Sequence, residues 1–141
     1  MCALRLNNVS VTDQQRTDAP RVVLSVEDDP AIQSLITDVL EEEGYRVLNA
    51  RNGAEAIELL DRTRPDVVVL DLLMPVMHGW EFMETYAERT GGAKIPIVVV
   101  SVNAVLPRSF DRFGVRSCIS KPFRINDLLQ AVEEAVQPVA A

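Results

Sequence analysis

The chain has 141 residues, 14 basic and 21 acidic, and a net charge of −7, which suits one domain and disfavours direct binding of nucleic acid, because that requires a basic surface. No apolar stretch reaches the roughly 18 residues of a membrane-spanning helix, and the first residues lack the apolar core of a signal peptide, so we expect a cytoplasmic domain that contacts no membrane. Two cysteines and one histidine are too few for a disulfide framework or a structural zinc site, and Cys2 and Cys118 fit reduced thiols.

From Pro20 onward, short apolar runs alternate with segments of helical periodicity. The apolar runs predict strands at residues 21–27, 45–50, 66–71, 95–101 and 115–119. The periodic segments predict helices from Pro30 to the stop signal Gly44 and at residues 53–63, 79–90, 107–113 and 124–137. Residues 1–19 and 138–141 carry no such pattern, and we interpret them as tails around one domain at 20–137.

This alternation is a (βα)5 pattern. Strands joined by right-handed helical crossovers form a doubly wound α/β fold, with a parallel sheet and helices on both faces. Five strands fit the flavodoxin-like order 2-1-3-4-5 better than the six-stranded dinucleotide-binding order. The first and third strands are adjacent in that order, so the carboxyl ends of these two strands are expected to border the ligand crevice.

Polar groups follow four of the predicted strands. Glu27 and Asp28 end the first strand, and Asp71 ends the third after a run of valine and leucine. Ser101 ends the fourth strand, and Lys121 follows the fifth. Converging carboxylates repel one another unless a cation is present, and a set of oxygen ligands favours Mg²⁺. A carboxylate beside a metal, an ammonium and a hydroxyl can accept a phosphoryl group as an acyl phosphate.

Each of these residues also has a structural interpretation. Ser101 alone fits a loop or cap residue, and Lys121 alone fits a solvated surface charge. Asp29 precedes a proline and is best explained as a helix N-cap. His78 fits an exposed turn, and Trp80 fits packing. Only the joint arrangement, with one polar group at each of four strand ends, is specific.

In this order, the residues resemble the receiver domain of two-component response regulators. The resemblance covers residues 20–137. Its motifs are Val26-Glu27-Asp28-Asp29-Pro30, Asp71-Leu72-Leu73-Met74-Pro75 with Gly79, Ser101 after three valines, and Lys121-Pro122-Phe123.

The resemblance implies a role for each site residue in a histidine-to-aspartate phosphorelay. Asp71 is the implied phosphoacceptor, Ser101 turns toward the phosphoryl group, and Lys121 pairs with a phosphoryl oxygen through a loop in which the bond to Pro122 is cis. The implied Mg²⁺ ligands are Glu27, Asp28, Asp71 and the backbone carbonyl of Leu73. A receiver catalyses only its own phosphorylation and dephosphorylation, so the protein is not expected to be an enzyme in the wider sense.

The implied partners are a histidine kinase or a histidine phosphotransfer protein, together with a downstream protein. The surface of the fourth helix, fifth strand and last helix is the implied docking or homodimer face. Only a short tail follows the last predicted helix, so we expect a stand-alone receiver whose change of state alters partner binding or passes the phosphoryl group on.

Three departures from the family pattern concern the route from phosphorylation to output. Cys118 stands where an aromatic residue is usual, and Val102 replaces a small residue beside Ser101. The segment that ends at Lys121 is about two residues shorter than is common in the family, and Pro107 interrupts it. We therefore expect residues 102–114 to respond to phosphorylation without a relay through residue 118.

Three alternatives use similar features. A phosphohydrolase of the haloacid-dehalogenase type needs a second aspartate two residues after the nucleophile, where this chain has Leu73. A flavin-binding electron carrier needs phosphate donors after the first strand, where this chain has acidic residues that repel phosphate. A degenerate receiver that serves only as a docking surface is disfavoured by retention of the site residues, but Val102 and Cys118 leave it open.

Overall fold

The structure, a computed structural model, describes residues 20–72, 79–90, 95–102 and 114–137. Its elements are β2 (Val22–Val26), α2 (Pro30–Glu42), β3 (Arg46–Ala50), α3 (Gly53–Arg62), β4 (Val67–Leu70), α4 (Gly79–Thr90), β5 (Ile97–Ser101), β6 (Val115–Ser120) and α5 (Ile125–Val136). The ends of these elements lie close to the boundaries predicted from the sequence. The predicted helix at 107–113 lies outside the described residues. None of the helices in the described ranges is long and apolar enough to cross a membrane.

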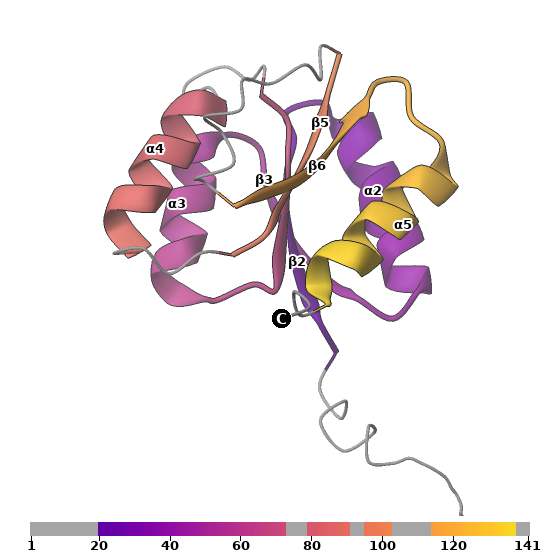
Figure 1. Cartoon of the computed structure of the whole chain (residues 1–141), viewed down its shortest axis with the longest axis horizontal. Coiled ribbons are helices and arrows are strands. Elements are labelled where there is room, and N and C mark those ends of the chain that lie inside the picture. The colour runs from indigo at the N-terminus through magenta and orange to yellow at the C-terminus, as the bar shows by residue number, and fades with distance from the viewer. Residues whose placement is uncertain (1–19, 73–78, 91–94, 103–113, 138–141) are drawn as a thin grey trace, which may run out of the picture.

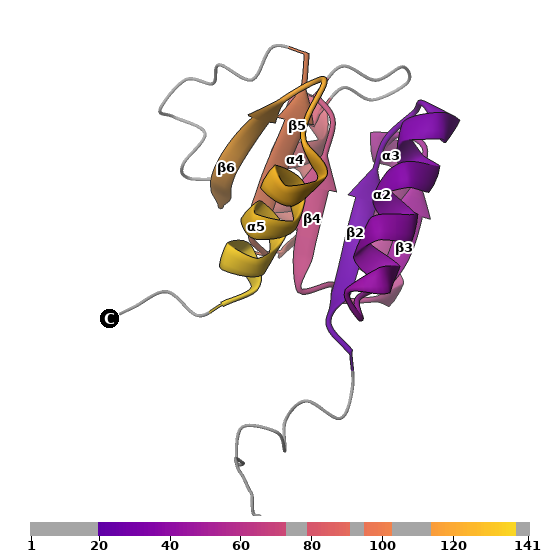
Figure 2. The ribbon, with the colours of Figure 1, turned by 90° about the vertical axis from the view of Figure 1, so that its right-hand side faces the viewer.

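The five strands form one parallel sheet in the order β3-β2-β4-β5-β6. Numbered along the predicted strands, this is the order 2-1-3-4-5, so the doubly wound (βα)5 fold is confirmed. Helices α3 and α4 lie on one side of the sheet, and α2 and α5 lie on the other (Figure 1). The turned view shows α2 and α5 in front of the strands (Figure 2).

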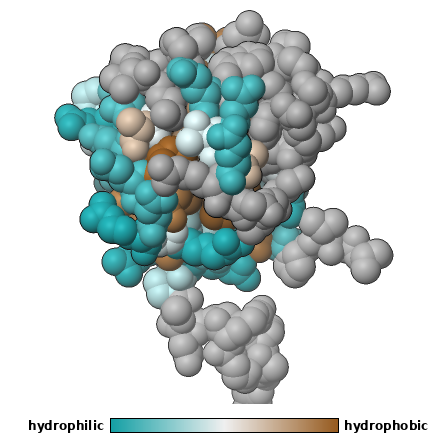
Figure 3. Space-filling view, turned by 90° about the vertical axis from the view of Figure 1, so that its left-hand side faces the viewer, coloured by the Kyte–Doolittle hydropathy of each residue, from teal (hydrophilic) through white to brown (hydrophobic). Residues whose placement is uncertain are grey.

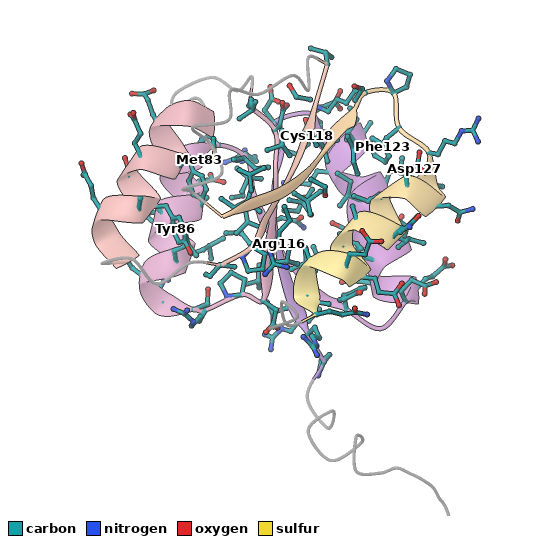
Figure 4. All side chains as sticks on the ribbon, in the orientation of Figure 1. Met83, Tyr86, Arg116, Cys118, Phe123 and Asp127 are labelled. Carbon is teal, nitrogen blue, oxygen red and sulfur yellow. The ribbon has the colours of Figure 1, made fainter. Side chains whose placement is uncertain are left out.

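The central strands are buried on both faces, as their valine and leucine runs predict. Alternate residues of β2 and β4 therefore belong to two cores. One core packs beneath α3 and α4 and includes Leu24, Val26, Val68, Leu70, Phe82, Met83 and Tyr86. The other packs beneath α2 and α5 and includes Val23, Ile36, Leu40, Val67, Val69, Leu128 and Val132. Met83 and Tyr86 are labelled on α4 (Figure 4).

The outer face formed by α3 and α4 is mostly hydrophilic where its residues are described (Figure 3). Hydrophobic residues show only between the polar ones near its centre. Helices of this kind bury one side against the sheet and expose the other to water.

Helix α2 begins as the sequence predicts. The Asp29 carboxylate accepts hydrogen bonds from the backbone N–H groups of Ala31, at 2.9 Å, and Ile32, at 3.4 Å. Pro30 occupies the first helical position, where its missing N–H costs nothing. Past the helix end, Gly44 has a φ of 95°, a left-handed conformation that glycine adopts readily. Asp29 is therefore a cap, and it sets the turn that carries Glu27 and Asp28.

Candidate functional site

The pairing of β2 with its neighbours brings two acidic strand ends together. Val26 pairs with Leu70 of β4, and just beyond this pair the Asp71 N–H donates to the Val26 carbonyl at 3.0 Å. On the other side, the Glu27 N–H donates to the Ala50 carbonyl at 3.0 Å. The backbone of both acidic residues is thus held by the sheet, at the edge where such folds bind ligands.

The three carboxylates form a compact cluster. Glu27, Asp28 and Asp71 each offer an oxygen, and these oxygens all lie within 4.8 Å of one another. Glu27 is 2% exposed and Asp71 is 5% exposed, whereas Asp28 is exposed. Three like charges this close are unfavourable in a partly buried site, so the cluster favours binding of a cation.

Lys121, just after β6, supplies one positive charge to the cluster. Its Nζ lies 2.8 Å from Glu27 Oε1 and 3.1 Å from Asp71 Oδ2. The Lys121 N–H donates to the Ser101 carbonyl at 2.9 Å, which ties the loop after β6 to the end of β5. The peptide bond between Lys121 and Pro122 is cis, as the resemblance implied.

The pKa values of two groups in the site, Glu27 and Lys121, are both raised. Burial raises the pKa of the Glu27 carboxyl, and the Asp71 charge adds to the effect, while Lys121 and the Asp29 N–H oppose it. Burial alone would lower the pKa of Lys121, but its hydrogen bonds to Glu27 and Asp71 outweigh burial and raise that pKa. Lys121 therefore carries its charge at neutral pH, and one ammonium faces three carboxyl groups.

The Ser101 hydroxyl has no hydrogen-bond partner among the described residues. Ser101 is fully buried, and its Oγ makes no hydrogen bond to any described residue. An unsatisfied buried hydroxyl costs about 1–3 kcal/mol. Ser25 and Ser117 also have such hydroxyls, but only Ser101 lies at a strand end beside Lys121. This donor, the ammonium and the acidic cluster together fit a cation with a phosphoryl group.

Some residues singled out in the sequence lie outside the described residues, and two others are exposed. Leu73, His78 and the segment 103–113 lie outside them. Val102 is 64% exposed, and Cys118 is exposed on β6. Cys118 borders a cavity of about 450 Å³ between β6 and the start of α5 (Figure 4), whose other lining residues are Ile119, Ser120, Pro122, Phe123, Arg124 and Asp127.

The sequence reasoning missed one polar contact at the site. Gln33 of α2 donates from Nε2 to the carbonyl of Glu27, at 3.3 Å, and to the carbonyl of Ala50, at 3.0 Å. The available signal was a polar residue between Ile32 and Ile36, one turn after the acidic pair. Helical periodicity alone does not tell such a residue from a surface glutamine.

The chain belongs to the family of response regulator receiver domains, whose model matches residues 23–133. It is a receiver of the two-component type, a signalling domain that works by phosphorylation. Proteins with receiver domains interact with histidine kinases and phosphotransfer partners. Because the chain belongs to this family, it is neither a phosphohydrolase of the haloacid-dehalogenase type nor a flavin-binding electron carrier.

Two relatives illustrate the range of the family. The transcriptional regulatory protein PdtaR of Mycobacterium tuberculosis is 34% identical over 118 residues, which are 83% of this chain and 57% of PdtaR. Sporulation initiation phosphotransferase F of Bacillus subtilis is 28% identical over 112 residues, which are 79% of this chain and 90% of that protein. The chain thus spans little more than half of the first relative and most of the second.

Solved structures of receivers share the fold. The chemotaxis protein CheY4 of Vibrio cholerae is 28% identical with a TM-score of 0.74, covering 83% of this chain and 99% of CheY4. The receiver domain of a Pseudomonas aeruginosa sensor histidine kinase is 27% identical with a TM-score of 0.74, covering 84% of this chain and 98% of that domain. A magnesium ion is coordinated in the active-site cleft of the Pseudomonas structure.

Proposed function

We propose that Asp71 accepts a phosphoryl group from a histidine kinase or a histidine phosphotransfer protein, and that this changes how the protein binds its partners. The position of the Asp71 carboxylate carries the proposal. It is almost fully buried at a strand end, within 4.8 Å of two further carboxylates and 3.1 Å from the Lys121 ammonium. A carboxylate in such surroundings contributes little to packing and is suited to phosphoryl chemistry.

In the proposed step, a carboxylate oxygen of Asp71 attacks the phosphorus atom of a phosphohistidine. An oxygen–phosphorus bond forms as the phosphorus–nitrogen bond breaks, and the leaving imidazole keeps the electron pair and takes up a proton. The Lys121 ammonium offsets negative charge on the transferred group. The Ser101 hydroxyl, which has no partner among the described residues, donates a hydrogen bond to an oxygen of the transferred phosphoryl group.

The acidic cluster fits Mg²⁺, with Glu27, Asp28, Asp71 and the carbonyl of Leu73 as the proposed ligands. The two oxygens of Glu27 also accept hydrogen bonds, from Lys121 at 2.8 Å and from the Asp29 N–H at 3.1 Å, which hold its carboxylate in place. When bound, the ion supplies the positive charge that lets carboxylates and phosphoryl oxygens share one small site.

We also propose that the surface of β6 and α5 takes part in partner binding or in a homodimer. The cavity beside Cys118 and Phe123 supports this proposal, because it hollows the surface between β6 and the start of α5. The predicted fourth helix, which would complete the docking face, lies outside the described residues. We place the protein in the cytoplasm, where two-component partners and reduced cysteines are found.

Incubation with a small-molecule phosphodonor and Mg²⁺ tests the phosphoacceptor. One phosphate should add to the wild type by mass spectrometry, a chelator should prevent it, and Asp71→Asn should abolish it. Asp38→Asn is the matched control, because Asp38 is an exposed aspartate of α2. Labelling of Asp71→Asn at the wild-type level would overturn the proposal.

A further inference from the structure

We propose that Gln33 is a positioning residue for the cation site, because it fixes the backbone from which Glu27 and Asp28 project. The inference rests on the proposed function, since it concerns the same acidic cluster. The inference is based on two hydrogen bonds that Gln33 Nε2 donates, to the Glu27 carbonyl at 3.3 Å and to the Ala50 carbonyl at 3.0 Å.

These bonds join three elements at one point. Gln33 belongs to the first turns of α2, where its own N–H donates to the Asp29 carbonyl at 2.9 Å. The Ala50 carbonyl at the end of β3 also accepts the Glu27 N–H, at 3.0 Å. The backbone of Glu27 is therefore held at both of its polar groups, by β3 at the N–H and by Gln33 at the carbonyl.

A fixed carbonyl has a direct consequence for the next residue. The peptide group is planar, so the direction of the Glu27 carbonyl sets the plane of the bond to Asp28. That plane in turn restricts the directions in which the side chains of both residues leave the backbone. Gln33 thus acts on the geometry of the acidic pair without touching either carboxylate.

Asp28 depends on this restraint more than Glu27 does. The Glu27 carboxylate has its own anchors, the Lys121 ammonium and the Asp29 N–H. The Asp28 carboxylate is exposed and makes no hydrogen bond to any other residue in the described ranges. It nevertheless lies within 4.8 Å of two other carboxylates, which repel it. Its position near them is therefore decided by the backbone that Gln33 holds.

The expected effect is on cation affinity. Removing a residue that orients a metal ligand typically weakens binding about 10- to 100-fold. Gln33 acts through the backbone, so we expect the lower end of that range. A residue that only stabilised the fold would lower the melting temperature without changing the affinity of the folded protein for Mg²⁺.

Calorimetric titration with Mg²⁺ tests the inference on the wild type, on Gln33→Met and on the control Gln130→Met. Gln130 is exposed on α5, and its side chain hydrogen-bonds only to Glu134 among the described residues, at 3.2 Å. Gln33→Met should weaken Mg²⁺ binding about tenfold, and Gln130→Met should leave it within about twofold. In an Asp28→Asn background, Gln33→Met should have little further effect, because the two changes act on the same ligand.

Equal Mg²⁺ affinity of Gln33→Met and wild type overturns this inference while leaving the proposed function intact. A wild type that binds no Mg²⁺ overturns both. If Gln33→Met does not fold, nuclear magnetic resonance of the wild type decides the matter. The side-chain amide signals of Gln33 should then shift on Mg²⁺ addition and those of Gln130 should not, and an unresponsive Gln33 amide counts against the inference.

Discussion

Lys121 Nζ lies closer to Glu27, at 2.8 Å, than to the proposed phosphoacceptor Asp71, at 3.1 Å. The Lys121 side chain is 12% exposed and that of Glu27 is 2% exposed, so this is a largely buried ion pair. In the unphosphorylated protein, the lysine therefore neutralises Glu27 as well as Asp71. In the proposed function the same ammonium pairs with a phosphoryl oxygen on Asp71, which is a second role.

Lys121→Met should destabilise the protein by about 3 kcal/mol, because it leaves the buried Glu27 carboxylate without its positive partner. Urea denaturation at pH 7 measures the change. Arg51→Met is the control, since it removes the exposed ion pair of Arg51 with Glu55, at 3.1 Å, and should cost below about 1 kcal/mol. Equal losses for the two variants would show that the pair of Lys121 with Glu27 contributes no more than a surface pair.

The stability of the metal-free protein should depend on pH through Glu27. Its pKa is raised in the folded state, chiefly by burial, above the ordinary value of 4.5. At pH values between 4.5 and the raised pKa of the folded state, Glu27 is protonated more often in the folded than in the unfolded protein. The stability that Glu27 contributes at low pH is therefore lost as the pH rises through this window. Glu27→Gln should therefore gain stability relative to wild type as the pH increases from 4.5 through the raised pKa.

Chemical denaturation of wild type and Glu27→Gln across pH 4 to 8, in the presence of a chelator, measures this difference. Glu55→Gln serves as a comparison of opposite sign, because hydrogen bonds from Arg51 lower the pKa of Glu55. The interpretation of Glu27 is wrong if the wild type becomes more stable relative to Glu27→Gln as the pH rises.

Ser101→Ala should leave the unphosphorylated protein at least as stable as wild type, and more stable by up to about 1–3 kcal/mol, because it removes a buried hydroxyl that has no partner among the described residues. It should, however, reduce the stabilisation that a phosphoryl analogue with Mg²⁺ confers on wild type. Thermal melts with and without beryllofluoride measure both effects. Ser120→Ala, at an exposed position of β6, is the control, and an undiminished response in Ser101→Ala would rule out a role for the Ser101 hydroxyl.

Asp28→Ala should weaken Mg²⁺ binding while leaving the metal-free fold as stable as wild type, or more stable by about 1 kcal/mol. The reason is that removing one of three crowded carboxylates relieves repulsion. Thermal melts with and without Mg²⁺ show both effects, with Asp38→Ala on the exposed side of α2 as the control. If Mg²⁺ stabilises wild type and Asp28→Ala equally, Asp28 is not a ligand.

Local patterns predicted the helices and strands of the described residues, and they singled out the candidate site residues. The valine run at Val67–Leu70 indicated a strand buried on both faces, and Asp29 before a proline indicated a helix start; the structure confirms both. These features depend on neighbours within a few residues, which the sequence displays directly. The strand order followed from the number of strands and from the handedness of crossovers, which are general rules.

The tertiary structure decided which atoms meet. Lys121 and Asp71 are 50 residues apart, and Gln33 and Ala50 are 17 apart, so no sequence period reports their contacts. Glu27 and Asp28 are adjacent and both acidic, yet one is buried against Lys121 and the other faces solvent. Burial and pairing of this kind depend on strand register and on how each loop leaves its strand. Register depends on which face of each strand is buried and on the loops that join the strands, so both are decided only when the whole sheet has assembled.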